Sequence, residues 1–163
     1  MNVTIRPFNN KDWILVSKIY EQGMATGVAT FETKAPSFEA WDKKFLPQCR
    51  IVAVSNDGVV GFGVLSAVSN RQVYKGVAEV TVYVAKEVRG KGIGKKLLKA
   101  LIEESENNGF WTLQASIFTE NIASIKLHEQ CGFRVVGVRE KIGQRFGKWY
   151  DNHFLERRST TIV

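Results

Sequence analysis

Apolar residues recur at helical spacing in the first third of the chain. Residues 10–23 begin with Asn10, a residue type that often caps helices, and carry apolar side chains three or four positions apart. The pattern predicts a helix there, after a short strand over residues 3–6, where polar and apolar residues alternate. A second helix is predicted to begin at Ser37, because the aromatic residues that follow share one helical face.

The apolar period changes to two after this second helix. Residues 50–54 and 59–66 are apolar runs joined by Ser-Asn-Asp-Gly, and an Asp-Gly pair in that place is typical of a β-hairpin. A loop over residues 69–76 precedes a predicted strand over residues 77–85. This strand leads directly into a glycine-rich stretch, RGKGIGKK, at residues 89–96.

The remaining residues alternate between the two periods. They predict a helix over residues 94–107, a strand over 111–118, a helix over 121–131 and two strands over 133–138 and 148–154. Hairpins combined with a strand-loop-helix unit predict an α/β or α+β domain with a mixed sheet. A purely alternating, doubly wound sheet fits this order less well.

Length and composition indicate one globular domain, residues 1–163, with 44% hydrophobic content. No apolar run approaches the roughly 20 residues of a membrane span, and the N-terminus lacks the apolar core of a secretion signal. Cys49 and Cys131 lie far apart, with no CxxC pair and no histidine cluster. We therefore expect a cytoplasmic protein with no membrane partner and no metal site.

The charge of the glycine-rich stretch is unusual for a helix start. The net charge of +7 allows any anionic partner, but four cations gather at the positive end of the predicted helix and three glutamates near its negative end. Each such charge opposes the helix dipole by roughly 0.3–1 kcal/mol. An anion bound at the helix start would remove the conflict. The cations are Arg89, Lys91, Lys95 and Lys96.

The glycines of this stretch favour a phosphate site. Gly90, Gly92 and Gly94 let the backbone approach an anion closely. The alternative is a flexible turn before a lysine-rich helix, which would have a similar sequence. A P-loop would need a hydroxyl residue after the Gly-Lys pair, and this chain has a second lysine. The dinucleotide fingerprint would need glycine at Lys95 and an acid near Gln114.

The spacing R-x-x-G-x-G at residues 89–94 resembles the pyrophosphate loop of the GNAT superfamily of acetyl-CoA-dependent N-acyltransferases. The resemblance implies a single-domain α/β (α+β) fold, with a mixed, largely antiparallel central sheet flanked by helices. It also implies acetyl-CoA as cosubstrate. The residues implied in cofactor binding are Val82, Tyr83, Val84, Arg89, Gly90, Lys91, Gly92, Ile93, Gly94, Lys95, Asn121 and Ser124.

Residues 71–154 resemble one branch of that superfamily, the phosphinothricin and methionine sulfoximine acetyltransferases. The shared pieces are AEVTVYV (78–84), N-x-x-S with LHEQCGF (121–133), GKWYD (147–151) and, upstream, ATFET (29–33). The resemblance implies transfer of an acetyl group to the α-amine of a small amino acid analogue. It further implies a homodimer and no nucleic-acid partner.

The expected catalytic residues are Glu79 and His128. An ammonium must lose a proton before it attacks a thioester, and the resemblance assigns the role of base to Glu79. His128 stands where the wider superfamily often has a tyrosine acting as general acid, so the identity of the acid stays open. The implied acceptor site consists of Phe31, Arg71 and Tyr74 with Glu79, because Arg71 would pair with a carboxylate.

Two alternatives remain at this stage. The chain could acetylate another amine, such as a polyamine, an antibiotic or a protein N-terminus. It could also be a non-catalytic module that binds coenzyme A or nucleic acid through its basic surface. The presence of Glu79 argues against the second alternative.

Overall fold

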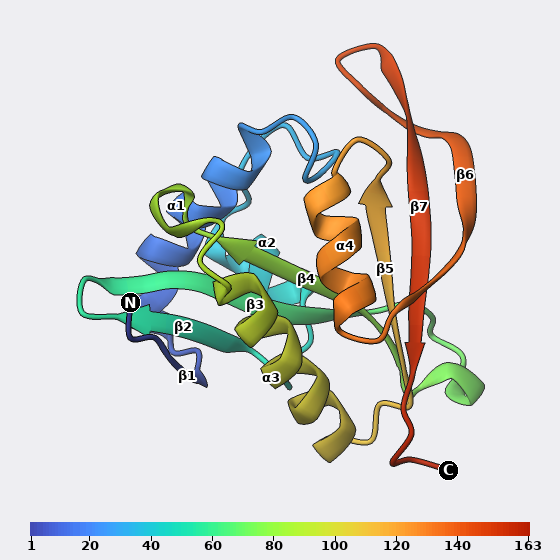
Figure 1. The fold of residues 1–163 in the computed structure, drawn as a ribbon, viewed down its shortest axis with the longest axis horizontal. Helices are drawn as coiled ribbons and strands as arrows, with labels where there is room; N and C mark the ends of the chain where they lie inside the picture. The colour runs from blue at the N-terminus through green and yellow to red at the C-terminus, as the bar shows by residue number, and fades with distance from the viewer.

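Seven strands form one sheet in the order β1-β2-β3-β4-β5-β7-β6 in the computed structural model, which describes residues 1–163 (Figure 1). Only the β4–β5 pair is parallel, and the other neighbours are antiparallel. The predicted mixed, largely antiparallel sheet is therefore confirmed. The strands are β1 Thr4–Pro7, β2 Ile51–Ser55, β3 Gly58–Ala67, β4 Val77–Val84, β5 Thr112–Phe118, β6 Arg134–Arg145 and β7 Lys148–Arg158.

Helices cover both faces of the sheet (Figure 1). Side chains of α3 lie against Gly61 and Gly63 of β3, whereas Phe62, on the opposite face, packs against Trp41 of α2. Helix α1 lies on the same face as α2 and approaches Tyr83 through Gly23. The helices are α1 Trp13–Met24, α2 Phe38–Lys44, α3 Ile93–Asn107 and α4 Ile122–Gln130, with 3-10 turns at Asn10–Asp12, Gln72–Tyr74 and Lys86–Val88.

The first helix begins differently from the prediction. Asn9 is the capping residue instead of Asn10, because its side chain accepts from the Lys11 N–H at 3.0 Å while the Asp12 carboxylate accepts from the Asn9 N–H at 2.9 Å. A 3-10 turn follows before α1 starts at Trp13. Arg6 donates twice to Asp12, at 2.8 Å each, and this pair lowers the pKa of the Asp12 carboxyl. Two adjacent asparagines leave such a choice to tertiary contacts.

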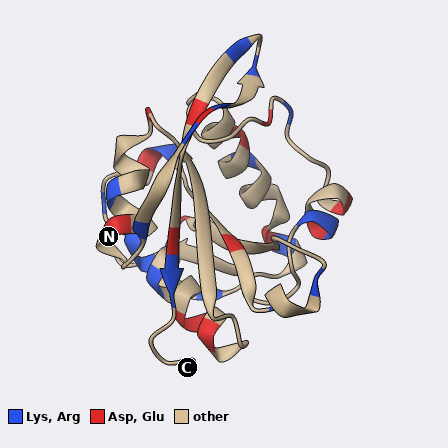
Figure 2. Ribbon diagram, turned by 90° about the vertical axis from the view of Figure 1, so that its right-hand side faces the viewer, with Lys and Arg blue, Asp and Glu red and all other residues tan.

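The last two strands are longer than the sequence pattern predicted. Residues 139–145 are mostly polar or charged, so periodicity alone misses them, yet they pair with β7 around a bulge between Arg139 and Gly143. Phe146 and Gly147, both with positive φ, close the hairpin. The β6–β7 hairpin projects beyond the helices, with basic residues near its tip (Figure 2).

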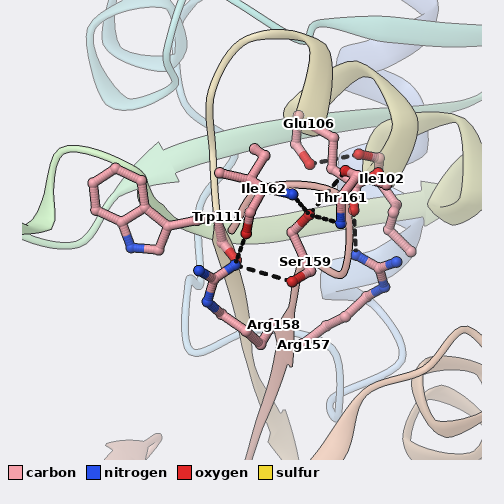
Figure 3. A network of polar contacts seen from close by, with 9 residues as sticks. Ile102, Glu106, Trp111, Arg157, Arg158, Ser159, Thr161 and Ile162 are labelled. Atoms are coloured by element: carbon pink, nitrogen blue, oxygen red, sulfur yellow. Dashed lines mark hydrogen bonds and ion pairs between the residues drawn. The ribbon is translucent and has the colours of Figure 1, made fainter.

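The C-terminal segment is tied to the end of α3 (Figure 3). Arg157 donates to Glu106 at 2.9 Å, and this hydrogen bond is the main reason that the pKa of Glu106 is lowered. Ser159 accepts from the N–H groups of Thr161 and Ile162 at 3.2 and 3.1 Å. The Ser159 N–H also donates to the Trp111 carbonyl at 2.8 Å, which joins the end of β7 to the residue before β5.

The described chain has no helix that combines the length and the apolar character needed to cross a bilayer. It also has no group of three or more His, Cys, Asp or Glu side chains arranged to hold a metal ion.

Candidate active site

Strands β4 and β5 separate in the middle of the sheet. Their pairing covers only Val77–Glu79 with Thr112–Gln114, although β4 continues to Val84 and β5 to Phe118. Beyond Glu79, the side of β4 that faces β5 therefore has no neighbouring strand. Main-chain groups along this edge are available to an extended, amide-containing ligand.

The start of α3 lies beyond the end of this free edge. Gly92 is the capping residue, has φ +78°, and provides no side-chain cap. The first N–H groups of α3 consequently lack partners within the helix. A Cβ atom added to Gly90 or Gly92 would meet no atom within 4 Å, so the backbone there borders open space. This geometry suits an anion such as a pyrophosphate.

Two adjoining cavities run from this helix start along β4. A cavity of about 490 Å³ lies between the start of α3 and α4, and one of about 290 Å³ lies between the end of α1 and β4. They share five lining residues: Val84, Arg89, Gly94, Ser124 and Leu127.

A third, smaller cavity contains Glu79. Its volume is about 150 Å³, and Tyr83 lines both this cavity and the second one. Ser66 of β3 lies beside Glu79 in register, and Ser116 of β5 lies across the gap. The remaining lining residues are Tyr20, Thr30, Lys44, Phe45, Val80 and Thr81.

The predicted cofactor residues come together around the first two cavities. All of them except Lys91, which is exposed, line one or both. Asn121 also joins two elements, because its side-chain oxygen accepts from the Ser124 N–H and its amide donates to the Val28 carbonyl, both at 3.3 Å. This second bond fastens the segment after α1 above the cavity between α1 and β4.

His128 is the buried residue of α4 and lines none of the three cavities. Its Nδ1 lies 2.7 Å from the Ser124 carbonyl oxygen, so Nδ1 carries the hydrogen and donates. Burial lowers the pKa of His128, although this hydrogen bond partly opposes the shift. A neutral ring in this tautomer offers Nε2 as an acceptor and has no proton there to give.

Two phenols stand between the second and third cavities. Tyr20 and Tyr83 have ring centroids 5.2 Å apart, and Tyr83 OH donates to the Ala29 carbonyl at 3.4 Å. Burial raises the pKa of both phenols, so both remain protonated donors at neutral pH.

The residues predicted for the acceptor lie outside the Glu79 cavity. Phe31 packs edge-on against Phe118, with ring centroids 4.5 Å apart. Arg71 and Tyr74 are exposed and stack on each other, with the guanidinium 5.3 Å from the ring centre. None of the three lines the cavity in this chain.

Sequence analysis missed several residues that line the Glu79 cavity. Thr30 had a signal, since it lies within the ATFET segment. Tyr20, Ser66 and Ser116 look like ordinary core or strand residues in the sequence. Lys44 is a basic residue at a helix C-terminus, where it complements the helix dipole, so its position needs no functional explanation.

Known proteins resemble this chain over most of its length. The family model described as an acetyltransferase (GNAT) domain matches residues 5–154. A stretch of 83 residues is 42% identical to L-methionine sulfoximine/L-methionine sulfone acetyltransferase from Pseudomonas paraeruginosa. That match covers 51% of this chain and 48% of the relative, so the chain spans about half the length of this curated protein.

Solved structures match nearly the whole chain. A phosphinothricin acetyltransferase from Sinorhizobium meliloti, in complex with acetyl-CoA, has a TM-score of 0.88 and 33% identity, covering 97% of this chain and 89% of that one. A ribosomal-protein-alanine N-acetyltransferase from Brucella melitensis has a TM-score of 0.87 and 30% identity, covering 96% and 99%. Together with the parted strands and the glycine-rich helix start, these matches show that the chain belongs to the GNAT acetyltransferase family.

Proposed function

We propose that this protein is an acetyl-CoA-dependent N-acetyltransferase that acetylates the α-amine of a small amino acid analogue by direct attack. The observation that carries the proposal is the succession of three cavities from the start of α3, along the free edge of β4, to Glu79. The sizes agree with the roles, because the two larger cavities suit a long cosubstrate and the smallest a compact acceptor.

The residues around the first two cavities fit coenzyme A. Backbone N–H groups from Gly90 to Lys95, together with Lys126, would hold the phosphates. The edge of β4 from Val82 to Val84 would bind the amide-containing pantetheine arm through main-chain hydrogen bonds. Acetyl-CoA supplies the acetyl group as a thioester whose reacting end would lie near Glu79.

Glu79 is proposed as the general base. It is half-buried, and Ser66 and Ser116 stand beside it at the point where the two strands part. A carboxylate there can take the proton of an incoming ammonium, directly or through a water molecule, and leave a neutral amine as nucleophile. A free β4 N–H can donate to the acetyl carbonyl oxygen as negative charge develops on it.

His128 remains a prediction for the residue that assists the leaving thiolate. Its tautomer and lowered pKa make it a poor proton donor at neutral pH. Thiols have an ordinary pKa near 8.5, so the thiolate needs little help to leave. We propose instead that His128 has a structural role, because it is buried against Phe133 and its bond to the Ser124 carbonyl lies within α4.

Two observations bear on the acceptor. The relatives named for methionine sulfoximine and phosphinothricin favour an amino acid analogue, and the 150 Å³ cavity suits an acceptor of that size. The similarity to a ribosomal-protein-alanine acetyltransferase supports a second candidate, the α-amine of a protein N-terminus. Both candidates place an α-amine at Glu79.

The exposed edge strand β6 bears on the oligomeric state. We propose a homodimer in which a second copy covers the β6–β7 hairpin, because most of edge strand β6 is exposed along its length of 12 residues. A partner subunit could also bring Arg71 and Tyr74 to the acceptor site, which they do not line within one chain. A cytoplasmic location stays a prediction.

The test is release of free thiol from acetyl-CoA with a panel of amines. We expect turnover with methionine sulfoximine or phosphinothricin, and a loss of about 10²- to 10⁴-fold in kcat in Glu79→Gln. Glu103→Gln, an exposed change on α3, is the control and should keep full activity. Turnover with peptides alone would favour the second candidate. Acetyl-CoA binding without turnover of any amine would contradict the enzyme proposal.

A further inference from the structure

The cavity that contains Glu79 has two charged residues in its lining, and they have opposite signs. Glu79 is the anion and Lys44 is the cation, while every other lining side chain is a neutral hydroxyl or an apolar group. A free α-amino acid is itself a zwitterion, with an ammonium and a carboxylate on the same carbon. One small cavity thus offers a partner for each of its charges.

The end of α2 fixes the backbone of Lys44. Trp41 and Phe45, on either side of it in the chain, are buried in the core with 0% and 3% of their surface exposed. The Lys44 side chain is half-exposed at 49%, and its ammonium lies 5.4 Å from the centre of the Phe45 ring. Because the backbone is anchored and the side chain is flexible, the ammonium can reach toward the cavity without disturbing the packing of the core.

The current partner of Lys44 is a weak one. The Lys44 ammonium lies 3.7 Å from the nearest Glu32 carboxylate oxygen, beyond hydrogen-bonding distance, and 54% of the Glu32 side chain is exposed. Such a surface pair contributes little to stability. A substrate carboxylate held inside the cavity would compete successfully with Glu32 for the Lys44 ammonium, because a charge-assisted hydrogen bond is stronger than this long surface pair.

We propose that Lys44 binds the carboxylate of the acceptor while Glu79 receives its ammonium. This inference rests on the proposed function, since it assumes that the acceptor is a free amino acid or an analogue of one. It replaces Arg71 as the carboxylate partner within a single chain, because Arg71 lies outside the cavity. Lys44 is a substrate-binding residue and takes no part in proton transfer.

The chain offers a matched control next to the test residue. Lys43 lies on the same helix, is 77% exposed, pairs with Glu39 and lines none of the three cavities. Lys44→Met and Lys43→Met therefore remove the same charge from adjacent positions. Two acceptors complete the design: methionine sulfoximine and its carboxamide, which keeps the α-amine but lacks the carboxylate.

In Lys44→Met we expect KM for methionine sulfoximine to rise about 10-fold, with kcat within about 3-fold, and KM for the carboxamide to stay unchanged. Lys43→Met should change neither. Glu32→Gln should lower KM for methionine sulfoximine by up to about 5-fold, because it removes the competing carboxylate. An equal rise of KM for both acceptors in Lys44→Met, or no rise for either, would overturn the proposal.

Calorimetry separates this inference from the proposed function. Methionine sulfoximine is titrated into the protein saturated with coenzyme A, which supports no turnover. Binding that weakens about 10-fold in Lys44→Met and not in Lys43→Met supports the role of Lys44 even if no amine is acetylated. Turnover of methionine sulfoximine with equal binding in all three proteins would refute Lys44 and leave the enzyme assignment intact.

Discussion

At the scale of single residues, burial decides how the ionisable groups near the site behave. The imidazole of His128 is 6% exposed, and this burial favours its neutral form, although the bond from Nδ1 to the Ser124 carbonyl partly opposes the effect. Glu79 and Lys44, by contrast, border a cavity and are free to meet a ligand. The role of each ionisable group therefore depends on whether the fold buries it or leaves it beside a cavity.

The protonation of His128 predicts a pH dependence of stability. Its folded pKa lies below the ordinary value of about 6.5, so the unfolded chain binds the proton more readily. This contribution is complete above pH 6.5 and is lost as pH falls through the folded pKa, by at most about 1.4 kcal/mol per pH unit. Urea unfolding between pH 7.5 and 5.5 should show this slope, reduced in His128→Gln.

His153→Gln is the control for that measurement, because His153 is the other histidine of the chain and pairs with Thr119 Oγ1 at 3.1 Å. It should keep the dependence that His128 causes. An unchanged slope in His128→Gln would contradict the assignment.

At the scale of elements, the start of α3 lacks local stabilisation that an anion at the proposed phosphate site would supply. Its lysines oppose the helix dipole, and its capping residue has no side chain to satisfy the first N–H groups. The opposite end of α3 is conventional, since the Glu104 carbonyl accepts from both the main-chain and side-chain N–H groups of Asn108. The C-terminus of α3 is capped and its N-terminus is not, so the free N–H groups at the N-terminus remain for the proposed phosphate site.

The two ends of α3 provide a test of this interpretation. Gly92 and Gly109 both have positive φ, +78° and +83°, and in both cases an added Cβ would meet no atom within 4 Å. Gly92→Ala and Gly109→Ala should therefore each cost about 1–2 kcal/mol of folding free energy. Only Gly92→Ala should also weaken acetyl-CoA binding, by about 10-fold or more in a calorimetric titration.

Equal affinity for acetyl-CoA in the two glycine variants would argue against the phosphate cradle. Similar losses of folding free energy, measured by urea unfolding, would show that the comparison is fair.

At the scale of the whole molecule, the exposed hairpin is the feature that a single chain leaves incomplete. Strand β6 has an unpaired edge, and several of its apolar side chains are exposed by about 40–50% of their surface: Val135, Val136, Val138 and Ile142. Long exposed edges of this kind are normally covered, because they promote association.

Val138→Lys should therefore shift the protein from dimer to monomer in sedimentation velocity. Ile14→Lys, a change at a 67% exposed position on α1, is the control and should leave the dimer intact. A monomer already present in the unmodified protein would contradict the dimer proposal.

Local pattern predicted the elements of the sheet and the helices well, because their apolar periods are regular. It also predicted the caps at Ser37 and Asn121, since both side chains accept from helix N–H groups as expected. The local pattern could not predict the second half of β6. This segment pairs with β7 while its side chains stay largely exposed, so it needs no regular apolar period. Asn9 is the capping residue instead of Asn10 because its side chain accepts from the Lys11 N–H and its own N–H donates to Asp12, which Arg6 also holds.

The amino-acid sequence by itself determined the family and the glycine-rich start of α3, because these depend on contiguous residues with a characteristic spacing. Only the tertiary structure decided which residues line the Glu79 cavity. Lys44, Ser66, Glu79 and Ser116 come from four separate elements, and the divergence of β4 from β5 makes the space between them. These side chains are distant in the sequence and come together only when the sheet forms, so no local pattern predicts their contact.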